Sequence, residues 1–87
     1  MPKVEKELTV LNAQGLHARP AALFVQITAK FDAAVTVSKD GESVNGKSIM
    51  GILMLGAERN SRIMVRADGN DAEQLVQELE EFLSRDE

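Results

Sequence analysis

The chain has no cysteine, tyrosine or tryptophan, and it carries only three phenylalanines and one histidine. Without cysteine it forms no disulfide, thiolate nucleophile or zinc–sulfur site, which is typical of a reducing compartment. So few aromatic rings leave no platform for stacked bases, and a net charge of −4 disfavours nucleic acids and anionic membranes. The N-terminal stretch MPKVEKELTV lacks the apolar run of a signal peptide, and no segment approaches the ~20 apolar residues of a membrane span. These absences predict a soluble, cytoplasmic protein.

The length of 87 residues is enough for one domain and leaves little room for a second core. Apolar residues make up 44 % of the chain, a fraction typical of globular proteins. We find no repeat, linker or low-complexity tract, so residues 1–87 are expected to form one domain. A domain this small should have a free energy of unfolding on the order of 5 kcal/mol.

Periodicity predicts seven elements in the order βαββαβα. Alternation of apolar and polar residues indicates strands at residues 5–11, 33–38, 43–45 and 62–67. Helical spacing indicates helices at residues 18–30 and 48–56, and a last helix that starts within ADGNDAEQL. Asp40-Gly41 is a hairpin signal, and short strands with a local hairpin favour an antiparallel sheet. The expected fold class is therefore α+β, with the helices covering one face of a four-stranded sheet.

Three local signals refine the helices. Ser48 is a favoured N-cap and Gly56 a natural stop, while Asn70 and Glu73 are spaced as a capping box. We expect the first helix to bury one stripe: Pro20, Leu23, Phe24, Ile27 and Phe31. We expect the last helix to bury another: Ala72, Leu75, Val76, Leu79, Phe82 and Leu83.

The single histidine, His17, lies in the stretch QGLHARPAA, where a turn leads into the first helix. Unpaired N–H groups at a helix start favour an anion, and Arg19 adds a fixed positive charge suited to phosphate oxygens. Gly15, two residues before His17, allows unusual backbone angles in this turn. The stretch predicts an anion-receiving site around a nucleophilic imidazole. The alternative is a surface or structural histidine, whereas one histidine alone builds neither a zinc site nor a hydrolase triad.

Two helix surfaces carry apolar residues with no evident place in the core. The back of the first helix is small and apolar, which indicates either a docking face or simple helix propensity: Ala18, Ala22, Val25 and Ala29, with Gln26 at the border. If Ile52 and Leu55 point inward, the neighbouring Ile49, Met50 and Leu53 remain near the surface, unless all of them belong to the core. Ser48 is either only an N-cap or also a phosphorylation site, since a phosphate there would sit at a helix N-terminus.

The stretches GLHARPAA and VNGKSIMGILMLGA together resemble the HPr family, histidine-containing phosphocarriers of the phosphoenolpyruvate-dependent sugar phosphotransferase system. The resemblance covers nearly the whole chain and implies an open-faced β-sandwich. It implies that His17 accepts a phosphoryl group on Nδ1 from enzyme I and passes it to the A components of sugar permeases. Arg19 and the backbone of Ala18 and Arg19 would hold the phosphate, and an ATP-dependent HPr kinase/phosphorylase would modify Ser48.

The resemblance also implies a partner-contact patch: Ala18, Ala22, Gln26, Ile49, Met50 and Leu53. We expect a carrier rather than a stand-alone enzyme, monomeric, without metal or cofactor, and with a transcriptional regulator as a further partner. Asn60 stands where many members have glycine, and its tolerance of left-handed angles preserves the turn. Gln26 and Ala29 stand where some members place lysines, which weakens the expected attraction of acidic partners.

Three alternatives remain open at the sequence level. A nitrogen-related phosphocarrier uses the same histidine for signalling, although KSIMG favours HPr itself or a kinase-regulated relative. A regulatory module would act only through phosphorylated Ser48. A structural α+β domain would carry His17 incidentally.

Overall fold

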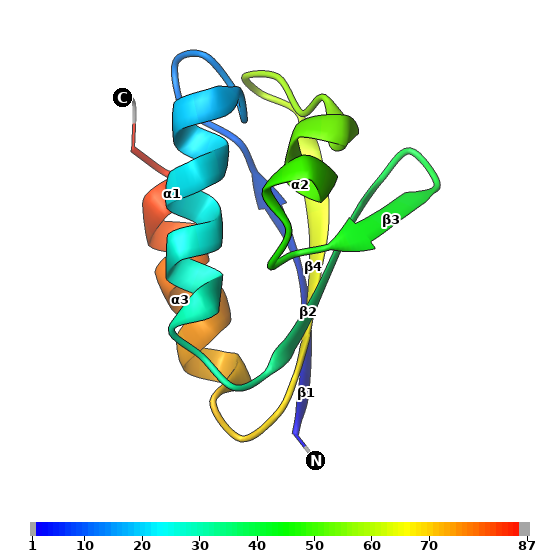
Figure 1. Cartoon of the computed structure of the whole chain (residues 1–87), viewed down its shortest axis with the longest axis vertical. Coiled ribbons are helices and arrows are strands. Elements are labelled where there is room, and N and C mark those ends of the chain that lie inside the picture. Colours follow the sequence, from blue (N-terminus) through cyan, green and yellow to red (C-terminus); the bar gives the residue numbers. More distant parts are fainter. Residues whose placement is uncertain (1, 86–87) are drawn as a thin grey trace.

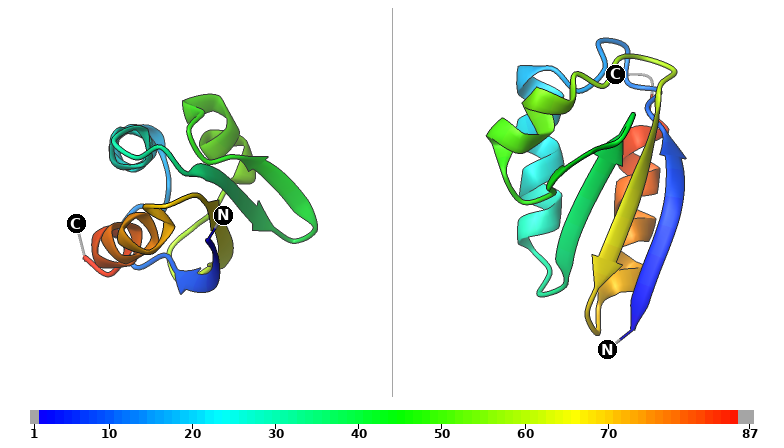
Figure 2. Two further views of the ribbon diagram at one scale, coloured as in Figure 1. Left: turned by 90° about the horizontal axis from the view of Figure 1, so that it is seen from below. Right: turned by 90° about the vertical axis from the view of Figure 1, so that its right-hand side faces the viewer.

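Four strands form a single antiparallel sheet in the computed structural model, which describes residues 2–85 (Figure 1). The strands lie in the order β1-β4-β2-β3 and the three helices cover one face (Figure 2). The elements are β1 (Lys3–Thr9), α1 (Ala18–Ala29), β2 (Ala34–Lys39), β3 (Glu42–Asn45), α2 (Ile49–Leu55), β4 (Arg62–Asp68) and α3 (Ala72–Leu83). The predicted fold class and element order are confirmed.

Strand alternation divides the sheet into a core face and an open face. Leu8 pairs with Ile63 across β1 and β4, and both side chains are buried beneath the helices. On the open face Glu5 pairs with Arg66, whose Nη2 lies 3.0 Å from Glu5 Oε2. The first strand is predicted two residues too late, because Val10 already leaves the ladder and donates its N–H to Ser61 O at 2.9 Å.

The turn between β2 and β3 has the geometry that its sequence predicts. Asp40 has a φ of 52° and Gly41 a φ of 86°, so both central residues are left-handed. Turns of this kind match the twist of the flanking strands and favour the Asp-Gly pair.

The last helix, α3, packs on β1 and β4, and its predicted stripe is confirmed: Ala72, Leu75, Val76, Leu79, Phe82 and Leu83 are all buried. The predicted capping box is wrong. Asp71, not Asn70, is the N-cap, and among residues 2–85 no hydrogen bond links Asn70 with Glu73. The Asp71 carboxylate instead accepts the N–H groups of Asp32 and Ala33, at 2.9 and 3.0 Å. It therefore fastens the α1–β2 connection to the start of α3.

The first helix, α1, contacts both other helices, and its predicted core stripe is partly wrong. The buried residues of α1 are Ala21, Phe24 and Thr28, whereas Leu23 is 40 % exposed. Thr28 can be buried because its Oγ1 donates to Gly46 O at 2.8 Å. The buried face of α1 therefore differs from the predicted stripe, and Val25, predicted on the outer face, also packs partly against the core.

Candidate functional site

The predicted acceptor, His17, is the N-cap of α1 and its side chain is exposed. The imidazole makes no capping hydrogen bond, and the carbonyl of His17 accepts the N–H of Ala21 at 2.8 Å. Pro20 has no N–H, so the free donors at this helix start belong to Ala18 and Arg19, which have no backbone partner among residues 2–85. These two donors and the positive end of α1 favour an anion beside the imidazole.

The second predicted residue, Arg19, is the second residue of α1, and its side chain is exposed. Within residues 2–85 no carboxylate or carbonyl pairs with that guanidinium. Its charge is therefore available to a phosphate or carboxylate, which a guanidinium binds through two parallel N–H donors. The start of α1 thus carries three predicted parts of the site: the imidazole, two backbone donors and one cation, the donors and the cation without partners in residues 2–85.

Close backbone contacts hold the loop that presents His17. Gly15 has a φ of 68°, and a Cβ there would lie 2.6 Å from the carbonyl oxygen of Ala57. The next residue, Leu16, is buried and donates its N–H to the same oxygen at 2.8 Å. Glycine is required at position 15 both for its left-handed angle and for the absence of a side chain.

Asn12 is a residue of this loop that sequence reasoning missed. It is only 2 % exposed, and its Nδ2 donates to Phe82 O at 3.3 Å while Leu11 donates its N–H to Leu83 O at 2.9 Å. Both bonds tie the loop to the end of α3. Asn12 Oδ1 is buried and has no partner among the residues that the structure describes. The turn that Asn12 begins was visible in the sequence, but its partner 70 positions away was not.

Ser48 is confirmed as the N-cap of α2, with its Oγ accepting the N–H of Gly51 at 3.1 Å. The segment before it is fixed to the end of α1, since Thr28 binds Gly46 and Lys47 Nζ donates to Phe31 O at 2.6 Å. Ser48 is half-buried, so a phosphate on it would lie at the start of α2 beside Ile49 and Met50.

Apolar side chains remain exposed on α1 and α2. Ile52 and Leu55 are buried as expected, while Ile49, Met50 and Leu53 are exposed by 45 %, 67 % and 37 %. Two members of this exposed set were missed: Leu23, and Met54 at 73 % exposure. The other residues of the predicted patch are also accessible, with Ala18 and Gln26 exposed and Ala22 half-buried.

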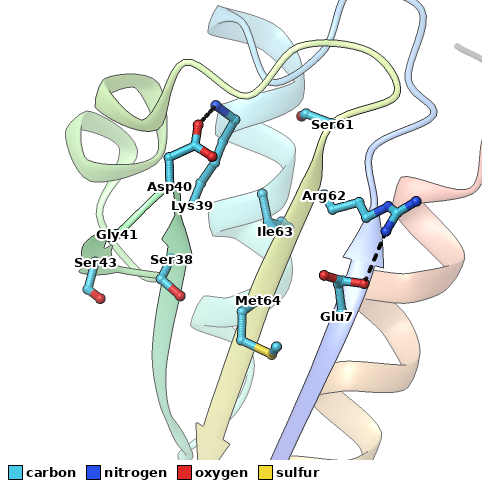
Figure 3. Close-up of a pocket in the computed structure, with 10 residues that line it drawn as sticks. All are labelled: Glu7, Ser38, Lys39, Asp40, Gly41, Ser43, Ser61, Arg62, Ile63 and Met64. Atoms are coloured by element: carbon cyan, nitrogen blue, oxygen red, sulfur yellow. Dashed lines mark hydrogen bonds and ion pairs between the residues drawn. The ribbon is translucent and has the colours of Figure 1, made fainter.

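Two surface hollows differ in how their charges are paired. The hollow in Figure 3, about 600 Å³, lies between the β2–β3 hairpin and the start of β4. Its cations already have anionic partners, because Lys39 pairs with Asp40 at 2.8 Å and Arg62 with Glu7 at 3.9 Å. A smaller hollow of about 410 Å³ includes Arg19. It is therefore the hollow that adjoins the predicted site.

Across residues 2–85, no three His, Cys, Asp or Glu side chains are grouped so that they could hold a metal ion. The helices within that range are too short and too polar to cross a membrane.

Comparison with known proteins gives a consistent result. A family model described as "PTS HPr component phosphorylation site" matches residues 4–85. The phosphocarrier protein HPr of Xylella fastidiosa (strain Temecula1) is 47 % identical over 79 residues, covering 91 % of this chain and 89 % of the relative. The HPr-like protein Crh of Halalkalibacterium halodurans is 41 % identical, covering 95 % of this chain and 99 % of the relative.

A solved structure shares the fold closely. The crystal structure of HPr from Bacillus anthracis superposes with a TM-score of 0.92 at 42 % identity. The match covers 97 % of this chain and 100 % of that one.

Proposed function

This chain belongs to the HPr family of phosphotransferase-system phosphocarriers, and we propose that His17 is the residue that carries the phosphoryl group. The observation that carries the proposal is the arrangement at the start of α1. An exposed imidazole without a capping bond stands beside the free N–H groups of Ala18 and Arg19 and an unpaired guanidinium. An imidazole in this setting is a nucleophile whose product, a phosphorylated ring, meets donors already in place.

In the proposed transfer, Nδ1 of the neutral His17 imidazole attacks the phosphorus of phosphorylated enzyme I. The new N–P bond forms as the bond to the donor breaks, and no other reactant is consumed. The phosphoryl group carries about −1.5 to −2 charges at neutral pH. The backbone donors and Arg19 stabilise that charge. Attack by the acceptor group of a permease A component then releases His17 unchanged.

Partner docking is proposed to use the exposed apolar residues of α1 and α2. Met50 has an adaptable side chain suited to several partners in turn, and Ile49 and Leu53 adjoin it on α2. Such contacts must be brief, which a small interface permits. We propose that enzyme I, the A components, HPr kinase/phosphorylase and a transcriptional regulator share this patch: Ala18, Ala22, Gln26, Ile49, Met50 and Leu53. The cytoplasm is the compartment in which these partners would meet it.

Regulation is proposed to act at Ser48. Phosphorylation would place a dianion at the N-terminus of α2, where the helix tolerates it, but next to Ile49 and Met50. An apolar contact surface with a new charge at its edge binds its former partners less well. A purely regulatory role is the second candidate, supported by the 41 % identity to the HPr-like protein Crh. The presence of His17 favours the phosphoryl carrier.

The test is incubation of the purified chain with enzyme I and phosphoenolpyruvate, followed by intact-mass measurement. We expect one added phosphoryl group on the native chain and none on His17→Ala, with the same circular dichroism for both. Thr9→Ala, an exposed change on β1, is the control and should be phosphorylated normally. A phosphorylated His17→Ala chain would refute the assignment.

A further inference from the structure

The hollow beside the carrier site is built from three separate parts of the chain. The loop before α1, the first turns of α1 and the end of α3 meet around a space of about 410 Å³, within the range of small-ligand sites. The lining residues that matter for a ligand are Asn12, Arg19, Pro20, Leu23, Phe82 and Arg85. His17 is not among the residues that line it, so this space is separate from the imidazole and shares only Arg19 with the carrier site.

The charges in this hollow are of one sign. Arg19 has no partner among residues 2–85, and Arg85 has only a 3.5 Å contact with Glu81, between two side chains more than half exposed. Among residues 2–85, no carboxylate lines the space. An exposed pair of this length contributes little, so Arg85 is readily drawn to another anion. In the Figure 3 hollow, by contrast, each cation already has a carboxylate.

Asn12 adds an unused acceptor. Its Nδ2 is engaged by Phe82 O, but Oδ1 has no donor although it is buried. Buried carbonyl oxygens normally have a partner, and an unpaired one favours any ligand that brings a hydroxyl or amino donor. Pro20, Leu23 and Phe82 supply apolar surface for a short carbon chain.

We propose that this hollow binds a small hydroxycarboxylic acid. Carboxylate groups match the guanidinium groups of Arg19 and Arg85, and the hydroxyl supplies a donor for Asn12 Oδ1 once that side chain, which is closed to solvent in the free protein, turns toward the hollow. Bound acid occupies Arg19, which the proposed function uses to stabilise the phosphoryl group. On that premise the acid slows phosphorylation of His17, so an organic acid regulates the carrier through Arg19.

Binding is tested by titrating the isotope-labelled full-length chain with L-malate and following backbone amide signals by NMR at constant ionic strength. We expect saturable shifts confined to residues 12–14 and 82–85 and to the first turns of α1. Succinate lacks the hydroxyl and should bind about tenfold more weakly. Arg85→Gln should also weaken malate binding about tenfold, while the matched control Arg62→Gln, from the Figure 3 hollow, should not.

The result is independent of the carrier assignment, because His17→Ala should still bind malate. Shifts that do not saturate, or that are equal in the native chain and Arg85→Gln, overturn the site. Inhibition is measured by comparing the rate of His17 phosphorylation with and without malate, separately for the native chain and for Arg85→Gln. Binding without slower phosphorylation overturns the regulatory part. If malate fails to bind while Arg85→Gln slows transfer, the guanidinium groups serve a carboxylate of the docked partner instead, and the proposal is wrong.

Discussion

The helices α1 and α3 have the same length and lie side by side, yet they use their surfaces differently (Figure 1). Six of the 12 residues of α3 are buried, against three of the 12 residues of α1. The apolar residues of α3 point into the core, whereas Leu23 of α1 remains 40 % exposed. The comparison indicates that α3 contributes more to the core, while α1 leaves its outer surface and its N-terminal end exposed.

The largest predicted effect is a difference in stability between matched leucine-to-alanine changes on the two helices. Leu79→Ala on α3 removes a fully buried side chain and should lower the free energy of unfolding by about 2–5 kcal/mol. Leu23→Ala on α1 removes a partly exposed one and should lower it by less than about 1 kcal/mol, since alanine also favours the helix. Urea unfolding measures both. Similar losses in the two variants would remove the distinction.

A smaller effect should come from the one buried polar residue of α1. Thr28→Val keeps the shape but leaves the buried carbonyl of Gly46 without its donor, at a loss of about 1–3 kcal/mol. Thr36→Val, on the open face of the sheet, is the matched control and should change stability by less than about 0.5 kcal/mol. If Thr28→Val unfolds at the same urea concentration as Thr36→Val, the hydrogen bond to Gly46 does not stabilise the packing of α1.

A third change should alter docking without altering the fold. Aspartate is also a good N-cap, so Ser48→Asp should leave the thermal midpoint nearly unchanged. Its charge next to the exposed residues of α2 should raise the KM of enzyme I for this carrier about 5- to 10-fold, or about 1–1.4 kcal/mol. Ser43→Asp, exposed on β3, controls for added charge. Equal transfer kinetics for the two variants would contradict a docking role for the start of α2.

The smallest effect concerns the contact that joins the ends of the two helices. The N–H of Asp32, followed by that of Ala33, holds the pKa of Asp71 below its ordinary value, while partial burial opposes the shift. Because the folded pKa is lowered, this stabilisation is complete above the unfolded pKa of about 3.9 and is lost as the pH falls through the folded value.

Asp71→Asn should therefore be less stable than the native chain near neutral pH, and the gap should close below pH 4. Urea unfolding at a series of pH values measures it, with the exposed Glu73→Gln as the control for loss of one charge. A gap that stays constant with pH would show that the carboxylate charge is not what fastens the α1–β2 connection.

The helix comparison also shows what sequence periodicity can predict. The stripe of α3 was predicted completely because its burial follows hydrophobicity alone. On α1 the same reasoning placed Leu23 inside and overlooked Ala21 and Thr28. Thr28 is buried through a hydrogen bond to Gly46, a long-range partner that periodicity does not contain. The predicted capping box at Asn70 failed for the same reason, because the N-cap of α3 is Asp71, whose carboxylate binds residues almost 40 positions earlier.

The residues of the candidate site also fall into two groups, those that local motifs predict and those that the tertiary fold brings in. His17, Arg19 and Ser48 stand in local motifs at helix starts, and the structure confirms those positions. Asn12 and Arg85 belong to the neighbouring hollow only because the end of α3 returns to the loop before α1. Contacts between the two ends of a chain are set by the tertiary fold, so local patterns could not predict them.

The loop before His17 is connected to the body of the protein on both sides. Val10 and Leu16 donate to Ser61 and Ala57, while Leu11 donates to Leu83. Amide protons of this loop should therefore exchange with solvent almost as slowly as those of a strand. Conformational entropy is lost once, during folding, and not again at each encounter. The backbone that presents His17 is therefore already ordered when a partner arrives, so docking does not have to order this loop.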